Sequence, residues 1–177
     1  MADQVKPGDI LATRSPGWTA AAIRIGAALT GKINLSNHVA IVVKTDAHGT
    51  LWVVEGKPGG VGWRQASDYL GSKWTITNAD QPKTDAQRKT VCDTAVHLIG
   101  TAYDWKAIAA DAADDLRQGF NWAPDWGQGQ VPGQVVCSSL AAYAYDQASL
   151  ARPPGKARTC QPGDWDTWCI TRGWAHG

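Results

Sequence analysis

The apolar positions of the chain change their spacing several times, and these changes predict short strands that are followed by helices. Runs rich in β-branched and apolar residues predict strands at 9–13, 38–44, 51–55, 61–64 and 73–77. The polar segment 45–50 contains a glycine and suits a hairpin turn between the second and third of these strands. We therefore expect a small antiparallel meander in the first half of the chain.

Longer segments with helical spacing predict the helices. The segment 84–99 opens with Thr-Asp-Ala-Gln, a capping-box pattern, and its apolar stripe includes Cys92, Val96 and Ile99. Further helices are expected at 18–30, 105–117, 137–150 and 165–171, with loops at 119–133 and 152–163. Since neither repeats nor a linker divide the chain, residues 1–177 are predicted to form one α+β domain, an antiparallel sheet packed against helices.

Composition and charge limit the classes of partner. A chain of 177 residues is long enough to bury a core, and 17 basic and 16 acidic residues leave a formal charge of +1. This balance gives no electrostatic footprint for nucleic acid or an anionic membrane. Residues 1–6 lack an apolar core and 18–29 are interrupted by Arg24, so neither a signal peptide nor a membrane span is expected. A cytoplasmic location is then the default, and the oligomeric state is open.

The cysteines do not form a metal-binding pattern. They stand at 92, 137, 160 and 169, without a C-x-x-C pair, and Cys92 and His97 are five residues apart on a predicted helix, where they point to different faces. Cys160 and Cys169 could pair in an oxidising compartment, but without a secretion signal free thiols are the expectation.

Cys137 and His38 are the candidate reactive pair. Cys137 lies at the start of a predicted helix, where unsatisfied backbone N–H groups and the helix dipole lower the pKa of a thiol. An imidazole such as that of His38 can complete the activation, because its pKa lies near neutrality. The alternative is structural: free cysteines are often buried in cores, and an isolated histidine often serves as a hydrogen-bonded structural residue.

The order of several segments resembles a known family. The matching segments are Pro7-Gly8-Asp9-Ile10, Asn37 to Val42, Trp52 to Glu55 with Gly60-Val61, Gly100 to Asp104, and Val136 to Leu140. In this order they resemble the circularly permuted papain-fold proteins, the YiiX-like relatives of the NlpC cell-wall peptidases and of the lecithin:retinol acyltransferases. As in the permuted members, the histidine precedes the cysteine.

The resemblance implies a role for each matching residue. Cys137 would be the nucleophile, His38 the general base and acid, and Glu55 the residue that orients the imidazole, with no metal or organic cofactor. Glu55 could instead be a solvated strand end. The relatives often carry an acidic residue two positions after the nucleophile, where this chain has Ser139.

The chain contains ten tryptophans, an unusual number beside one phenylalanine. Trp122 and Trp126 fall in the predicted loop that leads to Cys137, where exposed rings could stack on a sugar or hold an acyl chain. Together with Trp18 they are the candidate substrate-binding residues. The others inside predicted elements are expected to fill the core, namely Trp52, Trp74, Trp105, Trp165 and Trp168.

Three classes of function follow from these residues. The first is a cysteine peptidase or amidase that hydrolyses a short peptide or a peptidoglycan peptide through a covalent acyl-enzyme. The second is a lipid thioesterase or acyltransferase with the same dyad, and the third is a non-catalytic binding or structural module. Two routes to a target stay open: delivery to a cell wall by a phage particle or on lysis, or a target in the cytoplasm.

Overall fold

The structure is a computed structural model that describes residues 5–14, 35–70, 75–104, 134–157 and 160–174. Among these residues four strands come first, most helices follow, and the larger sheet is antiparallel, so the predicted α+β class is confirmed. The elements are β1 (Ile10–Thr13), β2 (His38–Thr45), β3 (Leu51–Lys57), β4 (Gly60–Gln65), α2 (Ser67–Leu70), β5 (Ile76–Thr77), α3 (Asp85–His97), β6 (Ala102–Tyr103), β7 (Gln134–Val135), α5 (Cys137–Gln147) and α6 (Pro162–Thr171). The predicted helices at 18–30 and 105–117 and the predicted loop at 119–133 lie outside the described residues.

The five-stranded sheet has the order β4-β3-β2-β1-β5, and every neighbouring pair is antiparallel. The meander is confirmed for β2, β3 and β4. The prediction that the strand at 73–77 continues this meander is wrong, because β5 pairs with β1 at the opposite edge. The chain reaches that edge by way of α2, whose Tyr69 packs on the back of the sheet against Leu11 and Ala40.

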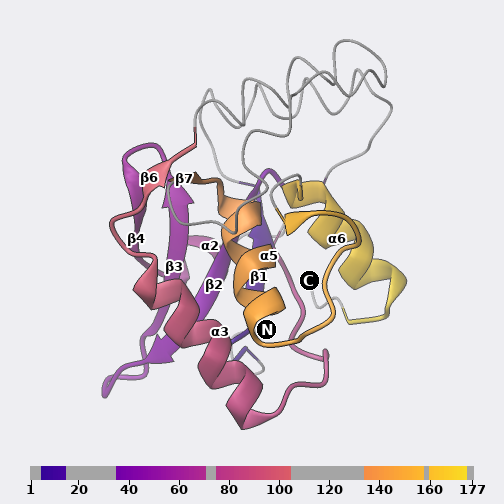
Figure 1. Cartoon of the computed structure of the whole chain (residues 1–177). Coiled ribbons are helices and arrows are strands. Elements are labelled where there is room, and N and C mark those ends of the chain that lie inside the picture. Colours follow the sequence, from indigo (N-terminus) through magenta and orange to yellow (C-terminus); the bar gives the residue numbers. More distant parts are fainter. Residues whose placement is uncertain (1–4, 15–34, 71–74, 105–133, 158–159, 175–177) are drawn as a thin grey trace.

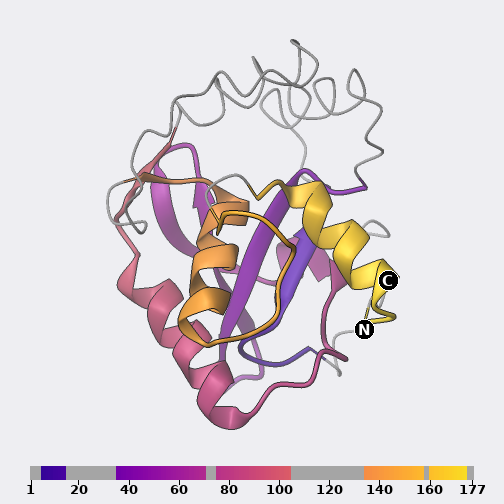
Figure 2. The same ribbon diagram turned by 45° about the vertical axis from the view of Figure 1, so that its right-hand side comes forward.

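Helices α3, α5 and α6 lie on one face of the sheet, as Figures 1 and 2 show. Side chains alternate along β2, so Val39 and Ile41 pack toward these helices, while Ala40 and Val42 pack on the back face with α2. The main core therefore lies between the sheet and the three helices. A smaller cluster lies behind the sheet and includes Tyr69.

The start of α3 follows the sequence prediction, and the predicted apolar stripe is correct for two of its three named residues. Thr84 caps the helix, and its hydroxyl accepts the backbone N–H of Gln87 at 3.2 Å. The buried residues of the helix are Val91 and Ala95, whereas Val96 is 40% exposed. Cys92 and Ile99 are partly buried and pack against the main core, so the prediction is confirmed for them and wrong for Val96. The centre of the buried face lies one position before the predicted stripe, at Val91 and Ala95, which is a rotation of about 100° on a helix.

Two of the tryptophans expected in the core are there. Trp165 is fully buried, with its ring centroid 5.1 Å from that of Tyr145 and 6.0 Å from that of Trp168. The core prediction is wrong for Trp52, which is half-buried and whose indole N–H donates to Asp46 at 3.0 Å. Trp74 and Trp105 lie outside the described residues.

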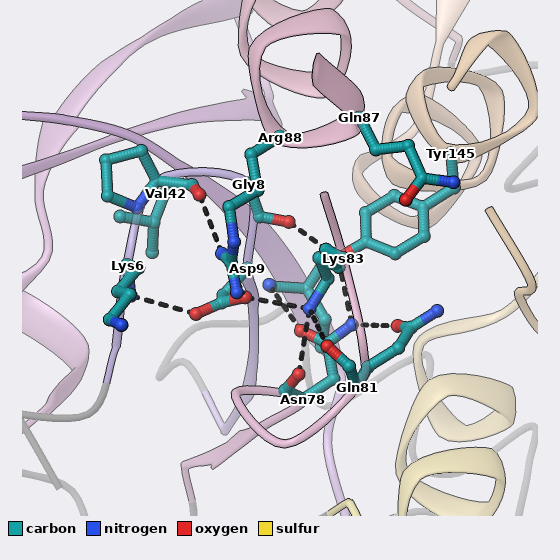
Figure 3. Close-up of polar contacts among 12 residues, drawn as sticks. Lys6, Gly8, Asp9, Val42, Asn78, Gln81, Lys83, Gln87, Arg88 and Tyr145 are labelled. Carbon is teal, nitrogen blue, oxygen red and sulfur yellow. Dashed lines mark hydrogen bonds and ion pairs between the residues drawn. The ribbon is translucent and has the colours of Figure 1, made fainter. Parts of the chain in front are cut away.

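A buried polar cluster fixes the turn before β1 to the rest of the molecule (Figure 3). The Asp9 carboxylate accepts hydrogen bonds from Lys83 at 2.7 Å and from Arg88 at 2.8 Å, and the side chains of both Asp9 and Lys83 are fully buried. Asn78 accepts the backbone N–H of Ile10 at 2.9 Å and donates to the Tyr145 hydroxyl at 2.8 Å. The cluster thus joins β1, α3 and α5 on the helical side of the sheet.

Candidate active site

Cys137 is the first residue of α5, as the sequence predicted. The residue before it, Val136, is the N-cap and has an extended backbone. The Ser139 hydroxyl accepts the Val136 N–H at 3.0 Å and donates to the Val136 carbonyl at 3.0 Å. Ser139 therefore makes one half of a capping box, in which the side chain at the third helical position accepts the N–H of the N-cap residue. The N–H of Cys137 is among those that an α-helix leaves without an intrahelical partner.

His38 is the first residue of β2, at the point where β2 and β3 part. The pairing of β2 with β3 ends at Ala40 and Glu55, while β2 continues along β1 to His38 and β3 continues along β4 to Lys57. The side chains of His38 and Cys137 lie close enough at this opening for each to shift the pKa of the other. The structure thus brings the predicted pair together.

Glu55 lies diagonally across from His38 on the neighbouring strand, where side chains on one face are within reach of each other. The Nε2 atom of His38 is 2.6 Å from Oε2 of Glu55. An ionised carboxylate only accepts hydrogen bonds, so Nε2 carries the proton and Nδ1 remains for Cys137. Glu55 is 2% exposed, so it is a buried partner of the imidazole and not a solvated strand end.

Three further side chains surround the Glu55 carboxylate, and the sequence analysis did not identify them. Oε1 is 2.7 Å from the Lys57 ammonium and 3.3 Å from Nε of Arg64, and Oε2 accepts a hydrogen bond from the Tyr69 hydroxyl. Lys57 and Arg64 carry a weak signal in the sequence, since both are basic and stand on the strand of Glu55 or the next one. Tyr69 carries none, because α2 is four residues long and has no periodic pattern.

The charges of the site favour a thiolate beside an imidazolium. Burial alone would raise the pKa of the Cys137 thiol, but the charge and hydrogen bond of His38 and the backbone of Val39 and Ser138 lower it. Burial alone would lower the pKa of His38, but Cys137 and, more weakly, Glu55 raise it to about 9. Burial opposes ionisation of Glu55, but the bond to His38 and the donors Lys57 and Tyr69 hold its pKa at about 2.

The other three cysteines have the opposite electrostatic character. Burial raises the pKa of Cys92 to about 11, and that of Cys160 and Cys169 to about 12. All four cysteines are free thiols in the structure. Because the thiolate is the nucleophile, Cys137 is the one cysteine whose surroundings favour the reactive form.

The C-terminal part of the chain supports both members of the pair. The backbone N–H of Ser36 donates to Asp166 of α6 at 2.7 Å, which anchors the residues just before His38. The Ser138 hydroxyl donates to the carbonyl of Cys160, which anchors the first turn of α5. These bonds hold the two segments that carry the reactive side chains.

Tyr103 lies beside the start of α5 because β6 and β7 form a parallel ladder, with Tyr103 opposite Val135. Tyr103 packs against Val136. Burial and the charge of Cys137 raise the pKa of Tyr103 well above its ordinary value, so the phenol stays protonated. The segment Gly100 to Asp104 therefore has a place next to the site, which the sequence alone did not establish.

The pair is nearly enclosed, with Cys137 4% exposed and His38 5% exposed. The candidate substrate-binding residues Trp18, Trp122 and Trp126 lie outside the described residues. Within the described ranges, no group of three or more His, Cys, Asp or Glu side chains is placed to hold a metal ion. No helix in the described part of the chain is long and apolar enough to cross a bilayer.

A nucleophilic sulfur, a base on a neighbouring strand and a carboxylate on the far side of that base form a chain of three groups. Such a chain can transfer a proton from the thiol to the imidazole and hold the resulting charge pair. Comparison with known proteins adds no relative: no protein-family model and no curated protein matches the chain.

Proposed function

We propose that the chain is a cysteine hydrolase that cleaves an amide bond, with Cys137 as nucleophile, His38 as general base and acid, and Glu55 as the residue that orients His38. The observation that carries the proposal is that His38 lies between two partners: its Nε2 atom is 2.6 Å from Oε2 of Glu55, and its imidazole and the Cys137 thiol shift each other's pKa. A structural cysteine needs no such arrangement, and Cys92, Cys160 and Cys169 have none.

In the proposed reaction the Cys137 thiolate attacks the amide carbonyl carbon and forms a tetrahedral adduct. The backbone N–H of Cys137 supplies one donor to the adduct's oxyanion. The His38 imidazolium gives its proton to the departing nitrogen, which leaves as the amine, and a thioester remains on Cys137. His38 then takes a proton from water, the water oxygen attacks the thioester, and the carboxylic acid is released with the thiol regenerated.

The resemblance to the permuted papain-like proteins supports the proposal through the order of the elements. The strand with His38 comes first, the strand with Glu55 second, and the helix that begins with Cys137 last. We include this permuted papain-like arrangement in the proposal, together with a short peptide or cell-wall peptide as the substrate class that it implies.

The low exposure of Cys137 favours a different function, a binding or structural module that retains the fold. In such a module the thiol would be protected from reagents, even though its neighbours lower its pKa. The two functions therefore differ in how fast the sulfur reacts with a small electrophile.

The test is the rate of iodoacetamide labelling at each cysteine from pH 5 to 10, resolved by mass spectrometry, in the parent and in a His38→Ala variant. Cys92, Cys160 and Cys169 serve as internal controls in the same molecule. We expect Cys137 to react below neutral pH and to lose this reactivity in the variant. Slow labelling that follows an ordinary thiol pKa of about 8.5, unchanged by the substitution, would favour the non-catalytic module.

If Cys137 is activated, the same protein is then incubated with peptidoglycan peptides, other short peptides and phospholipids. Release of an amine and an acid from a peptide, absent in Cys137→Ala, is the expected result. Transfer of a lipid acyl group to Cys137 would instead favour the thioesterase or acyltransferase class.

A further inference from the structure

The two oxygens of Glu55 have different partners. Oε2 accepts hydrogen bonds from His38 Nε2 and from the Tyr69 hydroxyl, while Oε1 is held by Lys57 and Arg64. A carboxylate has about four lone-pair positions, and these four groups use them all. The orientation of the carboxylate toward His38 therefore depends on the balance between the partners of its two oxygens.

The Tyr69 hydroxyl donates to Glu55, and its contact with a second partner, Lys57, fixes this direction. Nζ of Lys57 is 2.7 Å from the Tyr69 oxygen, and an ammonium group only donates, so the Tyr69 hydroxyl accepts from Lys57. Its own proton is then directed to Oε2 of Glu55. Burial and the contact with Glu55 raise the pKa of Tyr69 well above its ordinary value, so this proton is retained.

The partners of the two oxygens differ in exposure. The side chains of Lys57 and Arg64 are 31% and 46% exposed, so the pull on Oε1 comes from the solvent side. Tyr69 is 6% exposed and packs in the cluster behind the sheet with Ala40 and Val42, and its ring centroid is 5.7 Å from that of His38. The buried Tyr69 hydroxyl thus balances the attraction of Glu55 to Lys57 and Arg64, and it keeps Oε2 within hydrogen-bond distance of the His38 imidazole.

We propose that Tyr69 is a positioning residue for the candidate dyad: its hydroxyl holds Oε2 of Glu55 against Nε2 of His38 and so keeps Nδ1 directed at Cys137. This inference rests on the proposed function and extends it to α2. Without the Tyr69 hydroxyl, Lys57 and Arg64 would draw the Glu55 carboxylate away from His38. The His38 imidazolium would then no longer be held in the orientation that stabilises the Cys137 thiolate.

The groups that set the pH dependence come from every element around the pair. Cys137 on α5 and Glu55 on β3 face His38, and Tyr103 on β6 lies beside Cys137. Lys57, Arg64 and Tyr69 face Glu55. Asp68 of α2 lies 4.0 Å from Arg64 and is half-exposed. Tyr69→Phe changes none of these charges, so a shift in the pH profile would report orientation and not the removal of a charge.

The experiment is the pH profile of iodoacetamide labelling at Cys137 in the parent, Tyr69→Phe and the control Tyr143→Phe, which removes a hydroxyl from α5 itself. The acid limb of this profile is the pH range in which the labelling rate rises as Cys137 ionises. In Tyr69→Phe we expect the midpoint of the acid limb to rise by about 0.5–1 pH unit, so that labelling at pH 6 slows about 3- to 10-fold. The rate at pH 10, the upper end of the profile, should not change, because a shift of this size leaves Cys137 ionised there. Tyr143→Phe should match the parent.

A second variant and a second readout keep the test decisive if Tyr69→Phe folds poorly. In Lys57→Met the hydroxyl can still donate to Glu55, so the acid limb should move up by less than in Tyr69→Phe. In the parent, proton NMR should show a far-downfield, slowly exchanging Nε2 proton of His38, which should exchange faster with water in Tyr69→Phe.

The outcomes separate this inference from the proposed function. An activated Cys137 in the parent, with an unchanged profile in Tyr69→Phe, would overturn the role of Tyr69 and leave the hydrolase proposal standing. A larger shift in Lys57→Met than in Tyr69→Phe would assign the effect to charge and would also overturn it. An ordinary thiol in the parent, insensitive to His38→Ala, would overturn the hydrolase proposal and this inference with it.

Discussion

Gly56 on β3 lies directly against the start of α5, and a Cβ atom built on Gly56 would be 3.3 Å from the Cys137 nitrogen. That distance is shorter than the ordinary contact of a methyl group, and the nearby atoms belong to the backbone of Val136 and Cys137. The backbone of α5 has little freedom to yield because Ser139 caps it. The absence of a side chain at residue 56 is therefore what lets the helix start approach the sheet beside His38.

Gly56→Ala should displace the first turn of α5 and weaken the contact between Cys137 and His38. We expect a loss of about 1–3 kcal/mol in the free energy of unfolding and slower labelling of Cys137 at pH 6. Urea denaturation and labelling measure the two effects. Gly62→Ala on β4 is the matched control, since nothing lies within 4 Å of its added Cβ. Equal behaviour of the two variants would show that the close approach at Gly56 is unimportant.

Cys137→Ala should leave the fold intact and lower the pKa of His38. Burial acts to lower that pKa, and the largest effect that raises it to about 9 is the charge of Cys137. NMR titration of His38 in the parent and the variant measures the change, with Cys92→Ala as the control. Loss of folding in Cys137→Ala would instead identify Cys137 as a core residue.

Glu55→Gln should weaken the acid dependence of stability. Burial opposes the charge, but His38 and the other donors lower the pKa of Glu55 from 4.5 to about 2. A depressed carboxyl pKa contributes stability above pH 4.5 that is lost as pH falls toward 2, here on the order of 3 kcal/mol. Urea midpoints at pH 5 and pH 2.5 should therefore differ less in Glu55→Gln than in the parent. An unchanged difference would mean that Glu55 is not held as an anion.

Glu55→Gln should also slow turnover of any substrate that Cys137 cleaves while leaving the thiol in place. An amide in place of the carboxylate cannot accept from His38 and Tyr69 and at the same time hold both Lys57 and Arg64. A rate equal to that of the parent would remove Glu55 from the proposed mechanism.

Asp9→Asn should destabilise the protein strongly, because it leaves the cations of Lys83 and Arg88 without their anion. Lys83 is fully buried, and removing one partner of a buried pair typically costs about 3–5 kcal/mol. Urea denaturation at pH 7 measures the effect. Lys89→Ala, which breaks the exposed pair with Asp93, is the control and should change stability little. A small effect of Asp9→Asn would show that the cluster does not hold the turn before β1.

The sequence predicted the parts of the site that depend on local patterns. The β-branched runs that contain His38 and Glu55 indicated adjacent strands, and the short turn between them made those strands antiparallel neighbours. The helix beginning at Cys137 and the cap at Thr84 followed from residue types that favour those positions. These features need only neighbouring residues, and the structure agrees with each of them.

The parts that could not be predicted depend on contacts between distant segments. The two-residue strand β5 pairs with β1 across more than 60 positions, which no local pattern specifies. Tyr69 reaches Glu55 from a helix too short to show a period. On α3 the fully buried residues Val91 and Ala95 lie beside the predicted stripe and Val96 is exposed, because the packed sheet and not the spacing sets the centre of the buried face.

The bonds from Ser36 to Asp166 and from Ser138 to Cys160 affect the order in which the site assembles while the chain is being synthesised. Residues 160–166 leave the ribosome after the strand of His38 and after the start of the Cys137 helix, because a chain is made from its N-terminus. The sheet can form first, but the segments that carry the imidazole and the sulfur receive their last anchors only when this part of the chain has emerged. On a nascent chain the site around the Cys137 thiol would therefore stay incompletely assembled until residue 166 has emerged from the ribosome.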